Sequence, residues 1–354
     1  MEWYENNYKK LFIIPTLLIL LSVGVIGWQI ASTGDFVNKG VSLAGGVSAT
    51  VSIEDAVTQT DIEQAVRDRF PQADVASREL SSSGAQRTFV VDASEIAEDE
   101  QEAARQLVAF LEETYTVTSV STETTGPSLG EAFFIQTIIG ILLAFLWMGW
   151  VVYLYFGENM TIKVLMGLLA ATATVMATQG ILEGTTGLIA LFVIVLGAMA
   201  VYFSSSVPAG AVILAAASTV LFTLAVVNLI GMRLSTAGVA AFLMIIGYSV
   251  DTDILLSTRV LKSKETSVFK RIQDAFKTGI TMQLTTTAAV LVAYILASSE
   301  IIEQIMLIIL IGMIGDIIFT WLQNAGILYW FAKKQKTRKE NNRLASRKKR
   351  GGKK

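Results

Sequence analysis

Three carboxylates lie where a membrane protein would place functional groups. Asp251 and Asp253 occur in GYSVDTDILLSTRV, Asp316 occurs in IGMIGDIIFTW, and both segments lie within long apolar runs. An acid at the centre of a spanning helix costs about 2.5–3.5 kcal/mol on insertion scales, so such acids usually face protein or water and carry function. Carboxyl groups in these positions can take up and release protons. The sequence therefore predicts a proton-linked site.

The spacing of the first two acids leaves open which of them faces such a site. Asp251 and Asp253 are two residues apart, about 200° around a helix, so they cannot both point at one spot. One could face a cavity while the other forms an interhelical hydrogen bond, reaches the cytoplasmic interface or pairs with Arg259. Polar residues that could support the site are Tyr248, Ser249, Thr252, Arg259 and Thr286. Hydroxyl groups also pack spanning helices closely, which is the alternative role for Ser and Thr here.

The composition indicates a membrane protein. Of the 354 residues, 53% are hydrophobic and only 16% are charged, against about 25% charged in soluble domains. Cysteine and histidine are absent, which excludes disulfides, thiolate or imidazole metal ligands and His general bases. The sequence contains no nucleotide-binding loop and no nucleophile–base set, so we expect neither an enzyme nor a cofactor.

Apolar stretches long enough to cross a bilayer set the topology, since a span needs about 20 residues. The predicted spans are 11–30, 133–156, 162–182, 187–203, 208–230, 236–258, 279–299 and 303–331. The fourth is short and could instead be a re-entrant or tilted partner of its neighbours. Basic residues favour the cytoplasmic side, and they gather before the first span, in the loop 259–278 and after Trp330. Six or eight spans place all three basic regions in the cytoplasm, with both termini.

The segment between the first two spans reads as a folded acidic insert. Residues 31–132 contain 18 acidic and 6 basic side chains. Alternating and helical patterns predict strands at 47–53, 74–80, 87–93 and 116–124, with helices at 60–70 and 98–115. Thr60 and Glu63 have capping-box spacing, and SSSGAQ resembles a hairpin turn. The order β-α-β-β-α-β predicts a ferredoxin-like fold, suited to binding or coupling.

The chain therefore divides into four predicted parts: an anchor helix at 1–32, an extracytoplasmic ferredoxin-like α+β domain at 33–128, a transmembrane bundle of about seven helices at 129–332, and a basic tail at 333–354. The tail has 12 basic residues and one acid, and could bind RNA or anionic lipid. The simpler interpretation is a disordered topology determinant. No aromatic residue follows Phe331, so we expect no specific nucleic-acid recognition.

Three motifs carry a resemblance to a known family. GYSVDTDILLSTRV (247–260) resembles the fourth-helix motif of the SecF family of protein-export subunits, in its archaeal form. TTGPSLGEAF (124–133) is similar to the junction that follows the family's extracytoplasmic domain, and KGVSLAGGVSATVSI (39–53) is similar to the segment that begins it. The first motif is fairly specific, whereas the other two are weak on their own.

The resemblance implies an RND-superfamily fold: a polytopic α-helical bundle carrying the extracytoplasmic domain. It implies pairing with a SecD-like subunit, use of the proton gradient, and assistance to unfolded polypeptides leaving the SecYE channel in the plasma membrane, with membrane lipid around the bundle. By position, Asp251 and Asp253 would be the proton-linked site, Tyr248 and Ser249 its helix-packing neighbours, and Gly45 and Gly46 the turn that starts the domain.

The chain also departs from the family pattern. Bacterial relatives have Asn-Asp where this chain has Asp251-Thr252, and the helix before the motif offers Ser218 and Thr219 where many relatives have an acid. Most relatives have six spans, so two extra ones are expected within 157–207. Two other functions stay open: an RND-like exporter of lipids or small molecules that uses the same acids, and a passive structural subunit that carries no protons.

Overall fold

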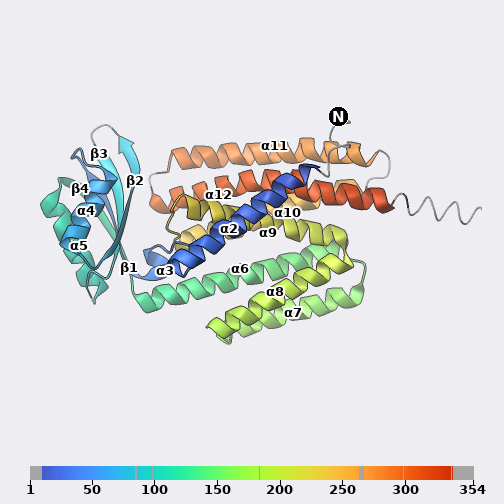
Figure 1. Ribbon diagram of the computed structural model, residues 1–354, viewed down its shortest axis with the longest axis horizontal. Helices are drawn as coiled ribbons and strands as arrows, with labels where there is room; N and C mark the ends of the chain where they lie inside the picture. Colours follow the sequence, from blue (N-terminus) through green and yellow to red (C-terminus); the bar gives the residue numbers. More distant parts are fainter. Residues whose placement is uncertain are drawn as a thin grey trace, which may run out of the picture.

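The computed structural model describes residues 10–83, 86–97, 99–182, 184–262, 267–297, 299–335 and 337. A long helical bundle carries a small α/β unit at one end (Figure 1). Lys9, the centre of the SSSGAQ turn, most of the basic tail and part of the loop 259–278 lie outside the described residues.

The α/β unit has the predicted order of elements. These are β1 (Gly46–Ile53), α4 (Gln59–Arg69), β2 (Asp74–Ser83), β3 (Gln86–Ser94), α5 (Glu100–Thr114) and β4 (Val117–Thr125). The strands lie in the order β2-β3-β1-β4, and each neighbouring pair is antiparallel. Strands β1 and β2 are therefore parallel with β3 between them, which is a split β-α-β connection.

Helices α4 and α5 bury their apolar stripes against this sheet. Ile62 and Val66 of α4 and Leu107 and Leu111 of α5 have no exposed surface, and they share one core with alternate residues of β1 and β3. The capping box of α4 is formed by Thr58 and Asp61. The predicted box at Thr60 and Glu63 was wrong, because the helix begins at Gln59 and Glu63 instead accepts a hydrogen bond from the β2 backbone.

Eight helices of the described chain are long and apolar enough to cross a membrane, in agreement with the eight predicted stretches. They are α2 (Ile13–Thr33), α6 (Pro127–Phe156), α7 (Met160–Thr178), α8 (Thr185–Ser205), α9 (Val207–Leu229), α10 (Thr236–Lys262), α11 (Val268–Ile295) and the continuous helix Ile301–Gln335. The last comprises α12 (Glu300–Ile318) from its second residue onward, the π-helical segment η1 (Phe319–Asn324) and the turns that follow it. The fourth stretch is a continuous helix of 21 residues, long enough to cross a membrane.

The bundle is built around α9 and α10. They are the most buried spans, with 61% and 56% of their apolar windows inside the protein. The α7–α8 hairpin lies to one side (Figure 1) and shares a core with α6 and α9. This hairpin lies within the region 157–207, where two extra spans are expected.

A short linker joins the first span to the sheet and ties both to the bundle. The Gly40 amide donates to the Leu234 carbonyl at 2.8 Å, and the Leu234 amide donates to the Asn38 carbonyl at 2.7 Å. The linker then forms the one-turn helix α3 (Val41–Ala44) and leads into β1. The α/β unit is thus held against the bundle by backbone pairing.

Candidate functional site: a buried carboxylate cluster

The structure brings two of the three predicted acids together. Asp253 of α10 has no exposed surface and Asp316 of α12 is 5% exposed, and the two carboxyls lie close enough to interact electrostatically. Asp316 is 15 residues into its span, about 22 Å at 1.5 Å per residue. Both acids therefore lie deep within the bundle, where an ionisable pair is costly unless neighbours stabilise it.

Amide and indole groups from two other segments complete the cluster. Asn324 Nδ2 donates to Asp253 Oδ1 at 2.7 Å, and Gln283 Nε2 donates to Asp316 Oδ2 at 2.5 Å. The other end of Gln283 is fixed, because Trp321 Nε1 donates to its Oε1 at 2.9 Å. A chain of hydrogen bonds therefore runs from Trp321 of η1 through Gln283 of α11 to Asp316 of α12.

A threonine hydroxyl lies between the two carboxyls. Thr320 Oγ1 donates to Asp316 Oδ1 at 3.2 Å and also lies beside Asp253. The fully buried Ser249 of α10 lies beside Asp316. A hydroxyl both donates and accepts, so a carboxyl–hydroxyl–carboxyl arrangement can hold a shared proton.

A π-helical segment contributes two polar residues to the cluster. The segment η1 is π-helical over Phe319–Asn324, a rare geometry that is frequent at functional sites. Thr320 and Asn324 both point inward from this one segment and are fully buried.

One carboxylate oxygen of the cluster is unpartnered. Asp253 Oδ2 is buried without a hydrogen bond among the described residues, since the Thr320 hydroxyl donates to Asp316 instead. Leaving a charged acceptor buried and unpaired costs several kcal/mol. A bound proton or water on this oxygen would remove that cost.

Asp251 faces away from this cluster, as the 200° spacing requires. It lies on the exposed stripe of α10 with Leu243, Met244, Gly247 and Tyr248. Asp251 is 15 residues from the start of α10, about 22 Å along a spanning helix. An acid at that depth on the chain surface needs a partner or water.

Three other residues that were predicted to support the site bond to backbone carbonyls instead of to the acids of the cluster. Thr252 is buried and bonds the Tyr248 carbonyl of its own helix at 3.3 Å. Arg259 donates to the Asp274 carbonyl at 3.3 Å, and no ion pair joins it to either acid in the described part of the chain. Thr286 bonds the Met282 carbonyl at 3.0 Å within α11.

Gly45 and Gly46 occupy the turn between α3 and β1. Their φ angles are +91° and +121°, a region that side-chain-bearing residues rarely adopt. A Cβ on Gly45 would lie 2.6 Å from Pro127 Cα, and one on Gly46 would lie 2.7 Å from the Ala93 carbonyl oxygen. These two glycines let the linker pass closely between α6 and β3.

The sequence prediction missed four members of the cluster: Gln283, Thr320, Trp321 and Asn324. Gln283 and Asn324 carried a usable signal, because amides inside apolar spans need hydrogen-bond partners. The described residues contain no group of three or more acids that could hold a metal ion.

Comparisons with known proteins agree with this architecture. The family model for "Protein export membrane protein SecD/SecF, C-terminal" matches residues 174–334, the part of the chain that contains the cluster. The SecF protein of Methanolacinia petrolearia is 30% identical over 334 residues, covering 93% of this chain and 96% of that protein. The SecF protein of Methanocaldococcus jannaschii is 28% identical, covering 94% and 99%.

A solved structure shares the fold. The crystal structure of SecDF, described as a translocon-associated membrane protein, from Thermus thermophilus matches with a TM-score of 0.62 and 18% identity. The match covers 93% of this chain but only 38% of that one. The chain belongs to the SecF family of protein-export membrane proteins.

Proposed function

We propose that this chain is the SecF-type subunit of an export complex, in which the Asp253–Asp316 cluster couples proton movement to polypeptide translocation. The observation that carries the proposal is the pair of carboxyls buried inside the helical bundle, with the Thr320 hydroxyl bonded to Asp316 and lying beside Asp253. Protonation of such a pair changes the charge inside the bundle. It would therefore bias two arrangements of α10 and α12.

Asp251 would lie at the contact with a SecD-like subunit. The supporting observation is the exposed stripe around Asp251, which includes Met244, 43% exposed, and Tyr248, 40% exposed. A partner helix that covers this stripe would supply the donor that a lipid environment lacks. Gly247 lies on the same face with open space around it, so a helix can approach closely there.

The α/β unit would hold the emerging polypeptide outside the membrane, beside the SecYE channel. Its edge strand β4 is exposed on both faces over most of its length, and it has β1 as its neighbour on one side only. An edge strand can pair with an extended chain through its free backbone groups. Both termini would then be cytoplasmic.

The test is export driven by a proton gradient. Vesicles carrying the channel, the SecD-like partner and this chain should translocate a preprotein faster with an imposed gradient than with an ionophore. Asp253→Asn and Asp316→Asn should give the ionophore rate under both conditions. Glu158→Gln, which removes a charge from the exposed α6–α7 loop, is the matched control and should retain the stimulation. Full stimulation in both cluster variants would refute proton coupling by this pair.

The partner assignment has a separate test, because the two parts of the proposal can fail independently. Asp251→Leu should stabilise the isolated chain in detergent or lipid, since it removes an acid from a lipid-facing position. The same change should reduce co-purification of the SecD-like subunit. Unchanged co-purification would show that the Asp251 stripe does not contact that subunit.

A further inference from the structure

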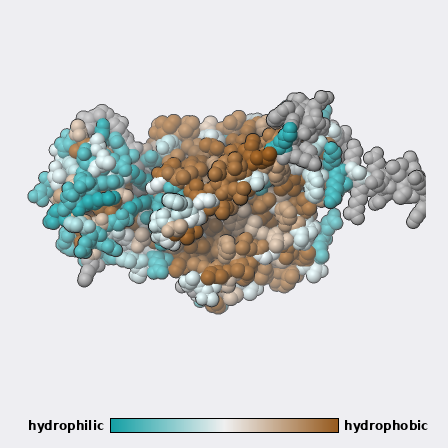
Figure 2. Space-filling view, in the orientation of Figure 1, coloured by the Kyte–Doolittle hydropathy of each residue, from teal (hydrophilic) through white to brown (hydrophobic). Residues whose placement is uncertain are grey.

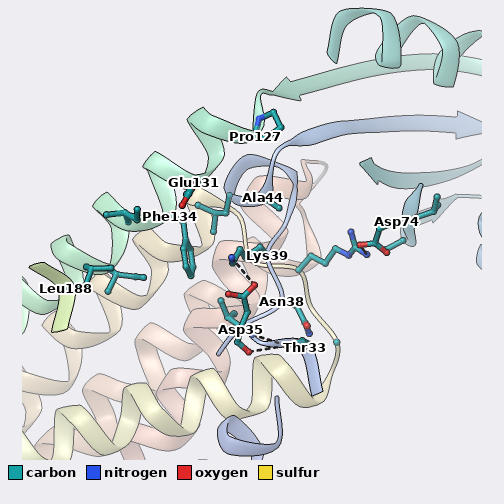
Figure 3. A pocket seen from close by; sticks show the side chains of 18 of the residues that line it. Thr33, Asp35, Asn38, Lys39, Ala44, Asp74, Pro127, Glu131, Phe134 and Leu188 are labelled. Atoms are coloured by element: carbon teal, nitrogen blue, oxygen red, sulfur yellow. Dashed lines mark hydrogen bonds and ion pairs between the residues drawn. The ribbon is translucent and has the colours of Figure 1, made fainter. Parts of the chain in front are cut away.

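A polar cavity lies between the α/β unit and the bundle. It has a volume of about 930 Å³ and is bordered by the linker after α2, the start of α6 and the start of β2. Figure 3 shows Asp35 and Lys39 from the linker, Glu131 and Phe134 from α6, and Asp74 from β2 around it. This is the level at which the spanning helices meet the extramembrane unit.

The cavity wall carries both signs of charge. Lys39 Nζ lies 2.9 Å from Asp35 Oδ2 and 4.4 Å from the centre of the Phe134 ring. A lysine ammonium has three donors, so two remain for a further ligand. The exposed carboxylate of Glu131 has no hydrogen bond or ion pair with another described residue. The lining as a whole contains three bases and four acids: Lys39, Arg67 and Arg233, with Asp35, Glu63, Asp74 and Glu131.

An apolar crevice continues from this cavity into the membrane part of the chain. It has a volume of about 130 Å³, and Val37, Phe134 and Ile138 line both spaces. Deeper in, it runs along α6 to Leu142 and against Phe242 of α10. The apolar face of the bundle is hollowed between α2 and α6 (Figure 2).

Side chains along one face of α6 change character with depth. Glu131, Phe134, Ile138 and Leu142 are three or four residues apart, so they lie on one side of the helix. Leu142 is eleven positions after Glu131, which corresponds to about 16 Å along the helix. A carboxylate therefore lies outermost, an ammonium over an aromatic ring comes next, and an apolar channel lies beneath.

We propose that the two connected spaces hold one phospholipid whose headgroup carries both a phosphate and an ammonium. Lys39 binds the phosphate, Glu131 pairs with the ammonium, and one hydrocarbon chain enters the crevice beside Ile138. The nearly balanced charge of the lining disfavours a purely anionic headgroup. A soluble phosphate would leave the crevice unused, and an extended peptide would fill the upper cavity only.

The bound lipid would fill the space between the linker and α6. It would thereby stabilise the contact between the α/β unit and the helical bundle. This role is independent of proton coupling, because none of the cluster residues lines either space. Failure of the lipid experiment would therefore leave the proposed function untouched.

The test is native mass spectrometry of the full chain from nanodiscs that contain equal amounts of phosphatidylethanolamine and phosphatidylglycerol. One phospholipid should stay bound at activation energies that strip the surrounding lipid, with phosphatidylethanolamine preferred. Glu131→Gln should keep the lipid but reduce this preference about fivefold, the equivalent of about 1 kcal/mol for one ion pair. Ile138→Trp should fill the crevice and abolish retention.

Leu168→Trp is the control, because Leu168 of α7 is 61% exposed and lines neither space. It should retain the lipid like the unmodified chain. Three outcomes would overturn the proposal: no retained lipid, an unchanged headgroup preference in Glu131→Gln, or equal lipid loss from both tryptophan variants. A photoreactive residue at position 138 that crosslinks to added unfolded polypeptide instead of lipid would also overturn it. Glu131→Gln changes only an exposed side chain, so its result does not depend on tolerance of the larger substitution.

Discussion

The hydrogen bond between Gln283 and Asp316 should appear as a measurable coupling energy in a double-mutant cycle. The donor and acceptor are 2.5 Å apart and both residues are at most 5% exposed. Side-chain hydrogen bonds between spanning helices average about 0.6 kcal/mol and reach about 1.7 kcal/mol in such cycles. The short, buried contact places this pair in the upper half of that range, at about 1–1.7 kcal/mol.

The cycle consists of Gln283→Leu, Asp316→Leu and the double variant, unfolded reversibly in mixed micelles with helicity as the signal. Loss of the Trp321 contact to Gln283 occurs in both backgrounds and cancels. The control cycle pairs Asp316→Leu with Thr286→Val, since Thr286 also lies on α11 but its hydroxyl donates to the Met282 carbonyl of its own helix and to no other described residue. That pair should be additive within about 0.5 kcal/mol. A Gln283–Asp316 coupling no larger than the control would refute the arrangement of the cluster.

Three further outcomes follow from the α/β unit and its junction. Gly45→Ala should lower the melting temperature more than Gly34→Ala: both glycines have positive φ, but a Cβ on Gly45 would lie 2.6 Å from a backbone atom of α6, whereas Gly34 has open space. Leu111→Ala should destabilise the unit by about 2–5 kcal/mol in equilibrium unfolding, because the side chain is fully buried. Hydrogen bonds from Thr58 lower the pKa of Asp61, so the cap of α4 is intact at neutral pH and is lost as pH falls through that lowered pKa. Hydrogen exchange in the first turn of α4, corrected for intrinsic rates, should rise on acidification and lose this pH dependence in Asp61→Asn.

The elements of this fold were predictable because their signals are local. Alternation in VSATVSI and the stripe of Ile62, Val66 and Phe70 depend only on neighbours along the chain. The capping box shows the limit of such signals. Thr58 and Thr60 both precede an acid by three residues, and only the position of the sheet decides which of them begins the helix.

The composition of the cluster was predictable only in part, because it depends on contacts between distant residues. The angular spacing correctly separates Asp251 from Asp253, but it does not show which of them faces inward. Gln283 and Asn324 reach the site from α11 and η1, 33 and 71 residues from their partners in sequence. The π-helical segment that carries Thr320 and Asn324 has no signature in a hydropathy pattern.

The two faces of α10 connect the buried cluster to the surface of the bundle, so a change in protonation at Asp253 can affect the exposed stripe. Asp253 joins the buried cluster while Asp251 lies on the exposed stripe two residues away, and the helix between them has no break. A rotation or tilt of α10 that repacks Asp253 against Asn324 must therefore also move Asp251 relative to whatever covers that stripe. Because a helix moves as a rigid element, the inner carboxyl and the outer surface share one equilibrium between two arrangements. In the proposed function, the partner subunit would thus sense the protonation of the cluster through α10 itself.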